Sequence, residues 1–395
     1  MKPAARAKDW LRGVLEHFAL PAAAKAEKRR DAAGLPALDP GNERVLPEII
    51  GWLARAQDHS RLRDGGVARD YSLIRGWASS YPETTGYIIP TMLEYARRTG
   101  QAEPRERALR MADWLVGIQF ADGSFQGGKI DSTPVVSVVF NTGQILLGLA
   151  AAQAETGRYL EPMRRAADWL VQVQDADGCW RRHVSPFAAG GGMQYMTHVA
   201  WGLFEAARIE PQRGWGEAGL RNVRWAIGAL PANGWFDHCC LSDIRHPLTH
   251  TLGYALRGVI EAYRFAPDPA LLDAAERTAR GLMSALRGDG HLPARLGSDW
   301  SAADDSACLT GSVQTAICWM LLYRLTGHAE YLVAARRANA YVRRTVRLDG
   351  PPGQRGGVKG SFPVDGAYGH FEYLNWAAKF AADSLMLEQD LAAAR

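Results

Sequence analysis

The sequence feature that most constrains the fold is an internal repeat. The segment ERALRMADWLVGIQFADGSF begins at Glu106, and a similar segment, RRAADWLVQVQDADGCW, begins at Arg164. Each has apolar residues at helical spacing and ends in an Asp-Gly turn with an aromatic residue just after it. Weaker copies end at residues 231–236 and 287–292. The repeat predicts one helical unit used several times.

A second and more apolar helix is predicted after each turn. Such helices begin near Thr84, Asn141, Thr197, Thr249, Leu309 and Tyr373. They recur about every 52 to 65 residues, which is in the size range of helical-hairpin repeats. The partner of the first hairpin is expected at residues 43–58. The first helix type carries charges on one face and should lie outside, whereas the second is apolar nearly all round and should be buried inside.

The last of the apolar helices indicates how the array ends. With Trp376, Phe380 and Leu385, it is as apolar as the middle ones, whereas an open stack of hairpins needs polar caps at both ends. We therefore expect an all-α fold in which six outer-inner hairpins close into a ring over residues 43–395. Residues 1–42 are expected to form an extra helix and a linker outside the ring.

These alternating helices resemble the (α/α)6 toroid. That architecture is shared by six-hairpin glycosidases, polysaccharide lyases and uronate epimerases and, more distantly, by terpene cyclases and prenyltransferases. The resemblance covers about residues 43 to 387 and implies a glycan-processing enzyme, although fold alone does not define chemistry.

Composition excludes several other classes of protein. The 395 residues are 47% hydrophobic and carry a net charge of +4 with interleaved signs, which does not indicate nucleic-acid binding. The N-terminal stretch holds scattered charges rather than an apolar signal segment, and no run predicts a membrane span, so we expect a cytoplasmic protein. The five cysteines contain no CxxC pair and are expected to be reduced. No cofactor is expected.

The loops that lead from outer to inner helices are long, and the returns are short, so the long loops should form the mouth of a cavity. The first long loop brings Arg75, Trp77, Tyr81 and Glu83 to this rim. Aromatic rings beside charged groups suit sugar binding. Packing for the rings and a helix-start role for Glu83 are the alternative.

The fourth loop is the densest in polar groups, with His238, Asp243, His246 and His250. A histidine with a neighbouring carboxylate can act as a general base or acid, so Asp243, His246 and His250 are catalytic candidates and His238 a substrate contact. A metal at His238, Cys239 and His246 matches no strong spacing pattern, and we predict none. Structural hydrogen bonding of His246 and His250 is the alternative.

The fifth loop holds Trp300, Asp304 and Asp305 before an inner helix. Its AADDSA string resembles the DxDDTA motif of class II terpene cyclases but has alanine in place of the first aspartate. The QFADGSF and QDADGCW turns resemble the QxxxGxW repeats of squalene cyclases, for which a structural role is favoured.

The last long loop is glycine-rich and resembles a mobile lid. Its candidate residues are Arg355, Lys359, His370, Glu372 and Tyr373. It lacks the GxxxxGK[ST] pattern of a nucleotide loop. Asn141 and His198 begin inner helices and are possible substrate contacts, although Asn141 is equally an ordinary helix cap.

The leading hypothesis is an enzyme that acts on a uronic-acid-containing glycan. Hydrolysis would pair Glu83 with Asp243 or Asp305, whereas elimination or C5 epimerisation would use His250, Tyr373 and Arg75. A terpene-cyclase-like enzyme that uses Asp304 and Asp305, and a noncatalytic glycan-binding protein, are the alternatives. The oligomeric state is left open.

Overall fold

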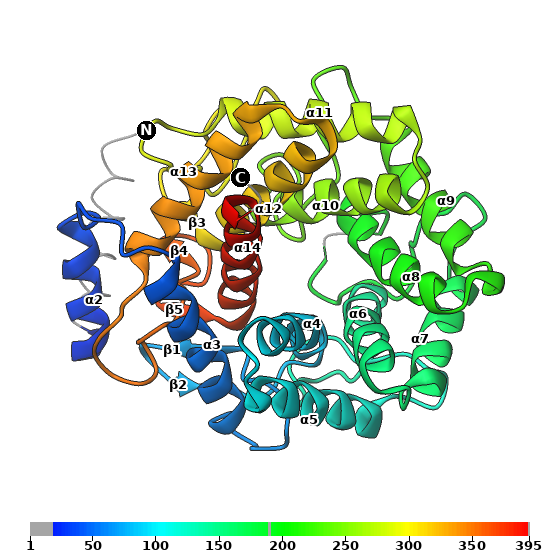
Figure 1. Cartoon of the computed structure of the whole chain (residues 1–395), viewed down its shortest axis with the longest axis horizontal. Coiled ribbons are helices and arrows are strands. Elements are labelled where there is room, and N and C mark those ends of the chain that lie inside the picture. The colour runs from blue at the N-terminus through cyan, green and yellow to red at the C-terminus, as the bar shows by residue number, and fades with distance from the viewer. Residues whose placement is uncertain (1–18, 189–190, 394–395) are drawn as a thin grey trace.

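The computed structural model describes residues 19–188 and 191–393. In this part of the chain, helices alternate between an outer and an inner ring (Figure 1). The outer helices are α3 (Asn42–Asp58), α5 (Ala102–Ile118), α7 (Leu160–Gln172), α9 (Trp215–Ile227), α11 (Pro269–Ser284) and α13 (Ala329–Thr345). The inner helices are α4 (Pro82–Thr99), α6 (Val139–Thr156), α8 (Thr197–Ile209), α10 (Thr249–Phe265), α12 (Leu309–Thr326) and α14 (Asn375–Ala393). The expected toroid is confirmed.

Burial follows the two sequence patterns. Inner helix α12 is buried without interruption from Leu309 to Leu322, because it is apolar or small on every face. Outer helix α7 buries one stripe that includes Met163 and Leu170 and exposes its charged residues. The apolar pattern therefore determines which helix of each hairpin lies inside.

The repeated Asp-Gly turns attach each hairpin to the next. Gly123 has a φ of 94°, which a residue with a side chain rarely adopts. The side-chain amide of Gln119 donates to the carbonyl oxygens of Gly123 and Pro162, both at 2.9 Å, and so joins the turn to α7. In the second copy, Gln174 bonds Gly178 and the next outer helix, α9, in the same way. The resemblance to squalene-cyclase repeats therefore reflects a structural tie.

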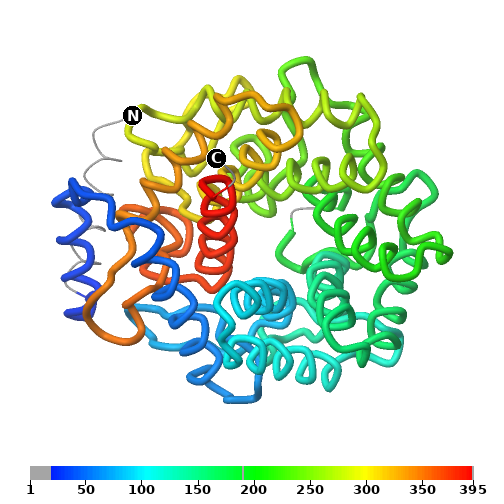
Figure 2. The backbone as a smooth tube through the Cα atoms, viewed as in Figure 1, coloured from blue at the N-terminus to red at the C-terminus, as the bar shows by residue number. Residues whose placement is uncertain are grey.

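The ring closes where α14 meets α3 and α4. Figure 2 shows the red C-terminal helix beside the blue and cyan helices of the first hairpin. Thr91 Oγ1 on α4 donates to Asp383 Oδ1 on α14 at 2.7 Å, and Arg98 forms an ion pair with Asp390 at 2.8 Å. Because the described helices close on one another, the array has no open end that would need a polar capping repeat.

Short strands fasten the long loops to one another. The strands are β1 (Asp70–Ser72), β2 (Gly76–Trp77), β3 (Ala307–Cys308), β4 (Ser361–Phe362) and β5 (Glu372–Leu374). β1 pairs with both β2 and β5, which joins the first long loop to the last, and β3 pairs with β4. Single-turn 3-10 helices η1 (Gln194–Met196) and η2 (Pro211–Arg213) flank α8.

Helix α2 (Ala22–Ala32) lies outside the ring (Figure 1). It is held by Lys359 of the last loop, whose Nζ bonds Glu27 at 3.0 Å and Asp31 at 2.5 Å. Residues 1–18 of the expected N-terminal segment lie outside the described residues, and the domain boundary at residue 42 stays a prediction.

Two further sequence expectations concern cysteines and membranes. Cys179, Cys239, Cys240, Cys308 and Cys318 are all free and buried. Among the described helices, none has both the length and the apolar character needed to cross a bilayer.

Candidate active site

A cavity of about 400 Å³ opens at the N-terminal ends of the inner helices. Its wall comes from the starts of α4, α6, α10 and α14 and from the long loops, as the alternation of long and short connections predicts. The lining residues are Arg69, Tyr81, Glu83, Tyr87, Gly128, Phe140, Asn141, Ser185, Phe187, Tyr195, Cys240, Leu241, Ser242, Leu248, His250, Thr251, Tyr254, Arg295, Ala367, Tyr368 and Trp376.

Glu83 is the carboxyl group of this cavity. It stands in the first turn of α4 and is only 9% exposed. Burial raises its pKa to about 7, although a hydrogen bond from Tyr81 and the positive charge of Arg69 both act to lower it. A carboxyl group with this pKa can both donate and accept a proton near neutral pH.

His250 faces the same cavity from the first turn of α10. Its Nδ1 lies 2.8 Å from Gln314 Oε1 of α12, and Nε2 has no partner among the described residues. Burial lowers the pKa of His250 to about 4, against the effect of the Gln314 hydrogen bond. The ring is therefore neutral at pH 7 and presents one nitrogen to a ligand.

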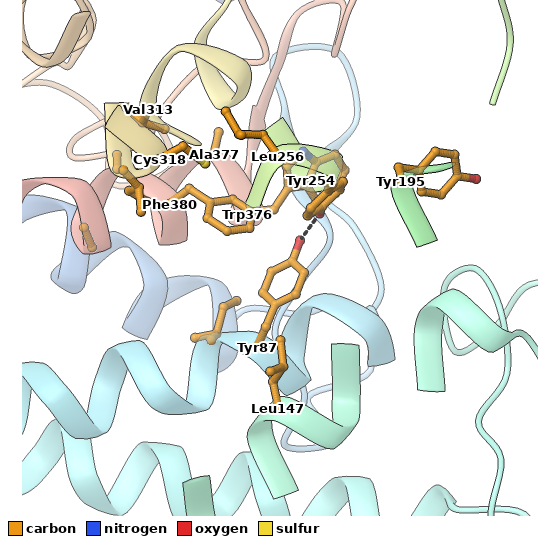
Figure 3. Packing of buried hydrophobic residues seen from close by; sticks show 14 of the residues in the cluster. Tyr87, Leu147, Tyr195, Tyr254, Leu256, Val313, Cys318, Trp376, Ala377 and Phe380 are labelled. Atoms are coloured by element: carbon orange, nitrogen blue, oxygen red, sulfur yellow. Dashed lines mark hydrogen bonds between the residues drawn. The ribbon is translucent and has the colours of Figure 1, made fainter. Parts of the chain in front are cut away.

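Aromatic residues form the floor of the cavity (Figure 3). The hydroxyl groups of Tyr87 and Tyr254 meet at 3.2 Å. The Tyr254 ring lies between two histidines, with centroid distances of 4.4 Å to His198 and 4.5 Å to His250. His198 is buried beneath this floor rather than on the lining, and its Nδ1 lies 2.6 Å from Gln144 Oε1.

An arginine and an amide give the cavity its means of holding an anion. Arg69 also lines the cavity, 5.1 Å from the Trp376 ring centroid, but its guanidinium is already paired with Asp70 and Glu372. Arg295 bonds a backbone carbonyl, that of His246, at 2.7 Å and makes no ion pair with a described residue. Asn141 Nδ2 is buried without a hydrogen-bond partner in the described part of the chain. A bound carboxylate or hydroxyl would satisfy these donors.

The expected pairing of two carboxylates does not occur in the structure. Among the described residues that line the cavity, Glu83 alone carries a carboxyl group. Asp243 instead accepts hydrogen bonds from the backbone of Arg245 and His246 in its own loop, and Asp305 is exposed. Their loops reach the cavity through other residues, such as Ser242 and Arg295, while Asp243 stays in its own turn and Asp305 is exposed to solvent.

Asp304 also serves a turn, since its Oδ1 accepts from the backbone nitrogen and the hydroxyl of Ser306. Trp300, expected at the rim, is buried against Trp235, with the two ring centroids 5.1 Å apart. Its indole N–H donates to the carbonyl oxygen of Asn233. The aspartate-rich motif therefore lies outside the cavity, which removes the basis of the terpene-cyclase reading.

The remaining histidine candidates of the fourth loop also lie off the cavity. His246 bonds Asp243 at 3.2 Å, and His238 is exposed. Cys239 is buried, and its thiol donates to Thr251 O at 3.3 Å. Within the described ranges, no three histidine, cysteine or acidic residues are arranged to hold a metal ion.

The last loop reaches the cavity through Ala367 and Tyr368, but none of its candidate residues lines it. Arg355 forms an ion pair with Glu48 of α3, Lys359 is buried against α2, and His370 is exposed. Tyr373 is buried on the side of Lys359, away from the cavity lining. Arg355 and Lys359 thus join the loop to α3 and α2, and its role as a lid stays a prediction.

Three candidates of the first and last loops meet beside the cavity rather than in it. Arg75, Trp77 and Glu372 line a neighbouring pocket, with Arg75 bonded to Glu372 at 2.8 Å. Of the sequence candidates, the cavity itself collects Tyr81, Glu83, Asn141 and His250.

Sequence analysis missed several lining residues. Tyr87 and Tyr254 lie one turn inside apolar helices and were indistinguishable from core. Arg69 and Arg295 stand in loops whose folding the repeat pattern does not encode. Helical spacing could have identified the two tyrosines. Tyr87 follows Glu83 by four residues, and Tyr254 follows His250 by four, so each shares a helix face with a candidate.

A double ring of alternating outer and inner helices is the (α/α)6 toroid fold. No protein-family model and no curated protein matches the sequence. Among solved structures, an unsaturated glucuronyl hydrolase specific for heparin is similar, with a TM-score of 0.72 and 14% identity over 89% of this chain and 98% of that one.

Two sugar-isomerising enzymes share the fold. Cellobiose 2-epimerase from Bacillus thermoamylovorans has a TM-score of 0.70 at 13% identity, covering 88% of this chain and 97% of its own. A D-mannose isomerase has a TM-score of 0.67 at 11% identity, covering 89% and 99%. At such identities the likeness establishes the fold.

Proposed function

We propose that this protein is a carbohydrate-active enzyme that transfers a proton to or from a short, uronic-acid-containing oligosaccharide. The observation that carries the proposal is Glu83, a buried carboxyl group with a pKa of about 7 that lines a cavity among aromatic rings. The similar hydrolase, epimerase and isomerase structures support a sugar as the ligand.

The site favours one type of chemistry over another. Ordinary glycoside hydrolysis needs two carboxyl groups that flank the bond, and here Glu83 has no carboxyl partner on the described lining. Proton transfer at a carbon beside a carboxylate needs one acid or base, a second proton carrier and a cation. Glu83, neutral His250 and Arg295 meet these needs. Elimination and C5 epimerisation are of this type. Addition of water to an unsaturated uronate needs a proton donor as well, at the neighbouring carbon C4, while water adds at C5.

Cavity size limits the length of the substrate. A volume of about 400 Å³ falls in the lower part of the ~300–1,000 Å³ range of small-molecule sites. One end of an oligosaccharide fits such a closed-ended cavity better than the middle of a polymer. Tyr195 and Trp376 provide apolar surface for a sugar ring.

The test is incubation of the protein in heavy water with saturated and unsaturated uronic-acid oligosaccharides. Absorbance of the unsaturated uronate, reducing ends and deuterium uptake by mass are followed together. A change in any readout that disappears in Glu83→Gln but persists in Asp243→Asn supports the proposal. Binding without any change would leave a noncatalytic glycan-binding protein, and neither binding nor reaction would refute a glycan ligand.

A further inference from the structure

A second pocket, of about 440 Å³, opens beside the central cavity on the first long loop. We call it the basic pocket. Its charged side chains are Arg61, Arg69, Arg75, Lys129, Asp70 and Glu372. Four cations and two carboxylates leave an excess of positive charge in one concave site.

Both carboxylates of the basic pocket are already engaged. Arg69 bonds Asp70 at 2.6 Å and Glu372 at 3.2 Å, and Arg75 bonds Glu372 at 2.8 Å. Asp70 and Glu372 are buried, so they are not free to swing toward other cations. The ion pairs fix Arg69 between the two acids.

Arg61 and Lys129 are left without an acidic partner. Neither forms an ion pair or a side-chain hydrogen bond with any residue of the described ranges. Arg61 is exposed and Lys129 is half-buried, so both can turn toward a ligand. A guanidinium and an ammonium group that converge on one pocket are donors for an oxyanion.

The basic pocket and the central cavity are contiguous. Arg69 lines both, and the chain passes from Gly128 on the cavity to Lys129 on the pocket. Arg69 is also close enough to Glu83 to lower its pKa. A ligand whose first sugar lies against Glu83 would therefore place its second sugar at the basic pocket.

We propose that the basic pocket binds an anionic group, either a sulfate ester or a carboxylate, on the sugar next to the one that reacts at Glu83. Arg61 and Lys129 hold the anion. Trp77 forms an apolar wall of the pocket. Its ring packs on those of Trp52 and Tyr71, with centroid distances of 5.3 Å and 5.0 Å. The inference rests on the proposed function and gives its substrates a preference for glycans with two successive acidic sugars.

The experiment measures the affinity of the full chain for three disaccharides by calorimetry. All three have the same uronic acid at the non-reducing end, and the second sugar is neutral, sulfated or itself a uronic acid. At least one acidic second sugar should bind about tenfold more tightly than the neutral one, with the advantage falling as salt is added. The better of the two acidic ligands identifies the anion. Equal affinity for all three would overturn the proposal.

Single variants assign the effect to the pocket. Arg61→Gln and Lys129→Gln should each remove most of the preference for the acidic second sugar and leave the neutral disaccharide unaffected. Arg63→Gln changes an exposed arginine of the same loop that does not line the pocket, and should retain the preference. Unchanged preference in both pocket variants would overturn the proposal. Melting temperatures confirm that each variant is folded.

The outcomes separate this inference from the proposed function. Turnover of all three disaccharides with equal affinity would refute the basic pocket and keep the catalytic proposal. Tighter binding of a disaccharide with an acidic second sugar, lost in the Arg61 and Lys129 variants and without turnover of any disaccharide, would support the basic pocket and refute the catalytic proposal.

Discussion

The hydroxyl groups of Tyr87 and Tyr254 meet at 3.2 Å across the axis of the ring. The two residues come from α4 and α10, which stand opposite each other among the inner helices (Figure 1). Tyr87 also lines a third cavity, of about 540 Å³, formed by the later turns of α4, α6 and α8 and by Lys379 and Asp383 of α14. The pair therefore closes the floor of the active-site cavity and separates it from the opposite end of the toroid.

The tyrosine pair predicts a measurable coupling. In a double-mutant cycle, Tyr87→Phe and Tyr254→Phe should show a coupling energy of about 0.5–1.5 kcal/mol in urea unfolding, since each removes one half of the same hydrogen bond. A second cycle, with Tyr254→Phe and Tyr195→Phe, is the control because the Tyr195 hydroxyl bonds neither of the two among the described residues (Figure 3). Equal coupling in both cycles would contradict the assignment.

Glu83→Gln should abolish most of the activity. Loss of a general acid or base lowers kcat by about 10²- to 10⁴-fold. For the unaltered protein, any step in which Glu83 donates a proton should decline as pH rises through about 7, because its pKa is raised to that value. The measurement is kcat against pH. A profile with no inflection between pH 6 and 8 in any assayed reaction would count against Glu83.

The same residue predicts how stability depends on pH. The pKa of Glu83 rises from 4.5, the ordinary value for a glutamate, to about 7 in the folded chain, equivalent to about 3 kcal/mol of favourable protonation. This contribution is fully present below about pH 4.5 and is lost as pH rises through about 7. The Glu83→Gln variant should therefore have a larger free energy of unfolding than the unaltered protein at pH 8, and the difference should be smaller at pH 5. Urea unfolding measures both values. A larger gain at pH 5 than at pH 8 would contradict this sign.

Gln314→Glu should raise the pKa of His250 above about 4, because a carboxylate at 2.8 Å favours the charged ring. Histidine resonances followed by NMR against pH measure the change, and activity should fall where His250 becomes protonated. Gln144→Glu is the matched control, since Gln144 contacts His198 beneath the floor rather than His250. The same effect of both variants on activity would argue against a role for His250.

Lys359→Met should destabilise the protein by about 3–5 kcal/mol, because Glu27 and Asp31 would remain buried without their cation. Lys28→Met, which removes a surface pair with Asp365, should change stability by less than about 1 kcal/mol. Urea unfolding provides both values. Similar small changes would show that α2 is held by other contacts.

Two glycines test the packing of the inner ring. A side chain on Gly148 of α6 would place its Cβ 2.2 Å from the carbonyl oxygen of Gly86 on α4, so Gly148→Ala should cost about 1–3 kcal/mol. Gly117 of α5 has open space around it, and Gly117→Ala should stabilise the helix by about 0.5–1 kcal/mol. Thermal melts distinguish the signs, and stabilisation by both changes would refute close packing of α4 and α6.

The sequence predicted the ring because the buried faces of its helices appear in the sequence as apolar residues at helical spacing. The inner helices observed at Thr197, Thr249 and Leu309 begin where the sequence placed them. Residues in the first turns of inner helices, such as Glu83, Asn141 and His250, were also identifiable, since the alternation of long and short connections indicates which end of the ring holds the cavity.

The sequence by itself thus determined the helices, their inner or outer place and the end at which a ligand can enter. Tertiary structure alone decided which loop residues reach the cavity. Asp243, Asp304 and Asp305 lie only a few residues before inner helices, yet each turns into its own loop or toward solvent. The physical reason is that helical position follows from a local period, whereas the direction of a loop side chain depends on contacts such as the pairing of β1 with β5, made between residues some three hundred positions apart.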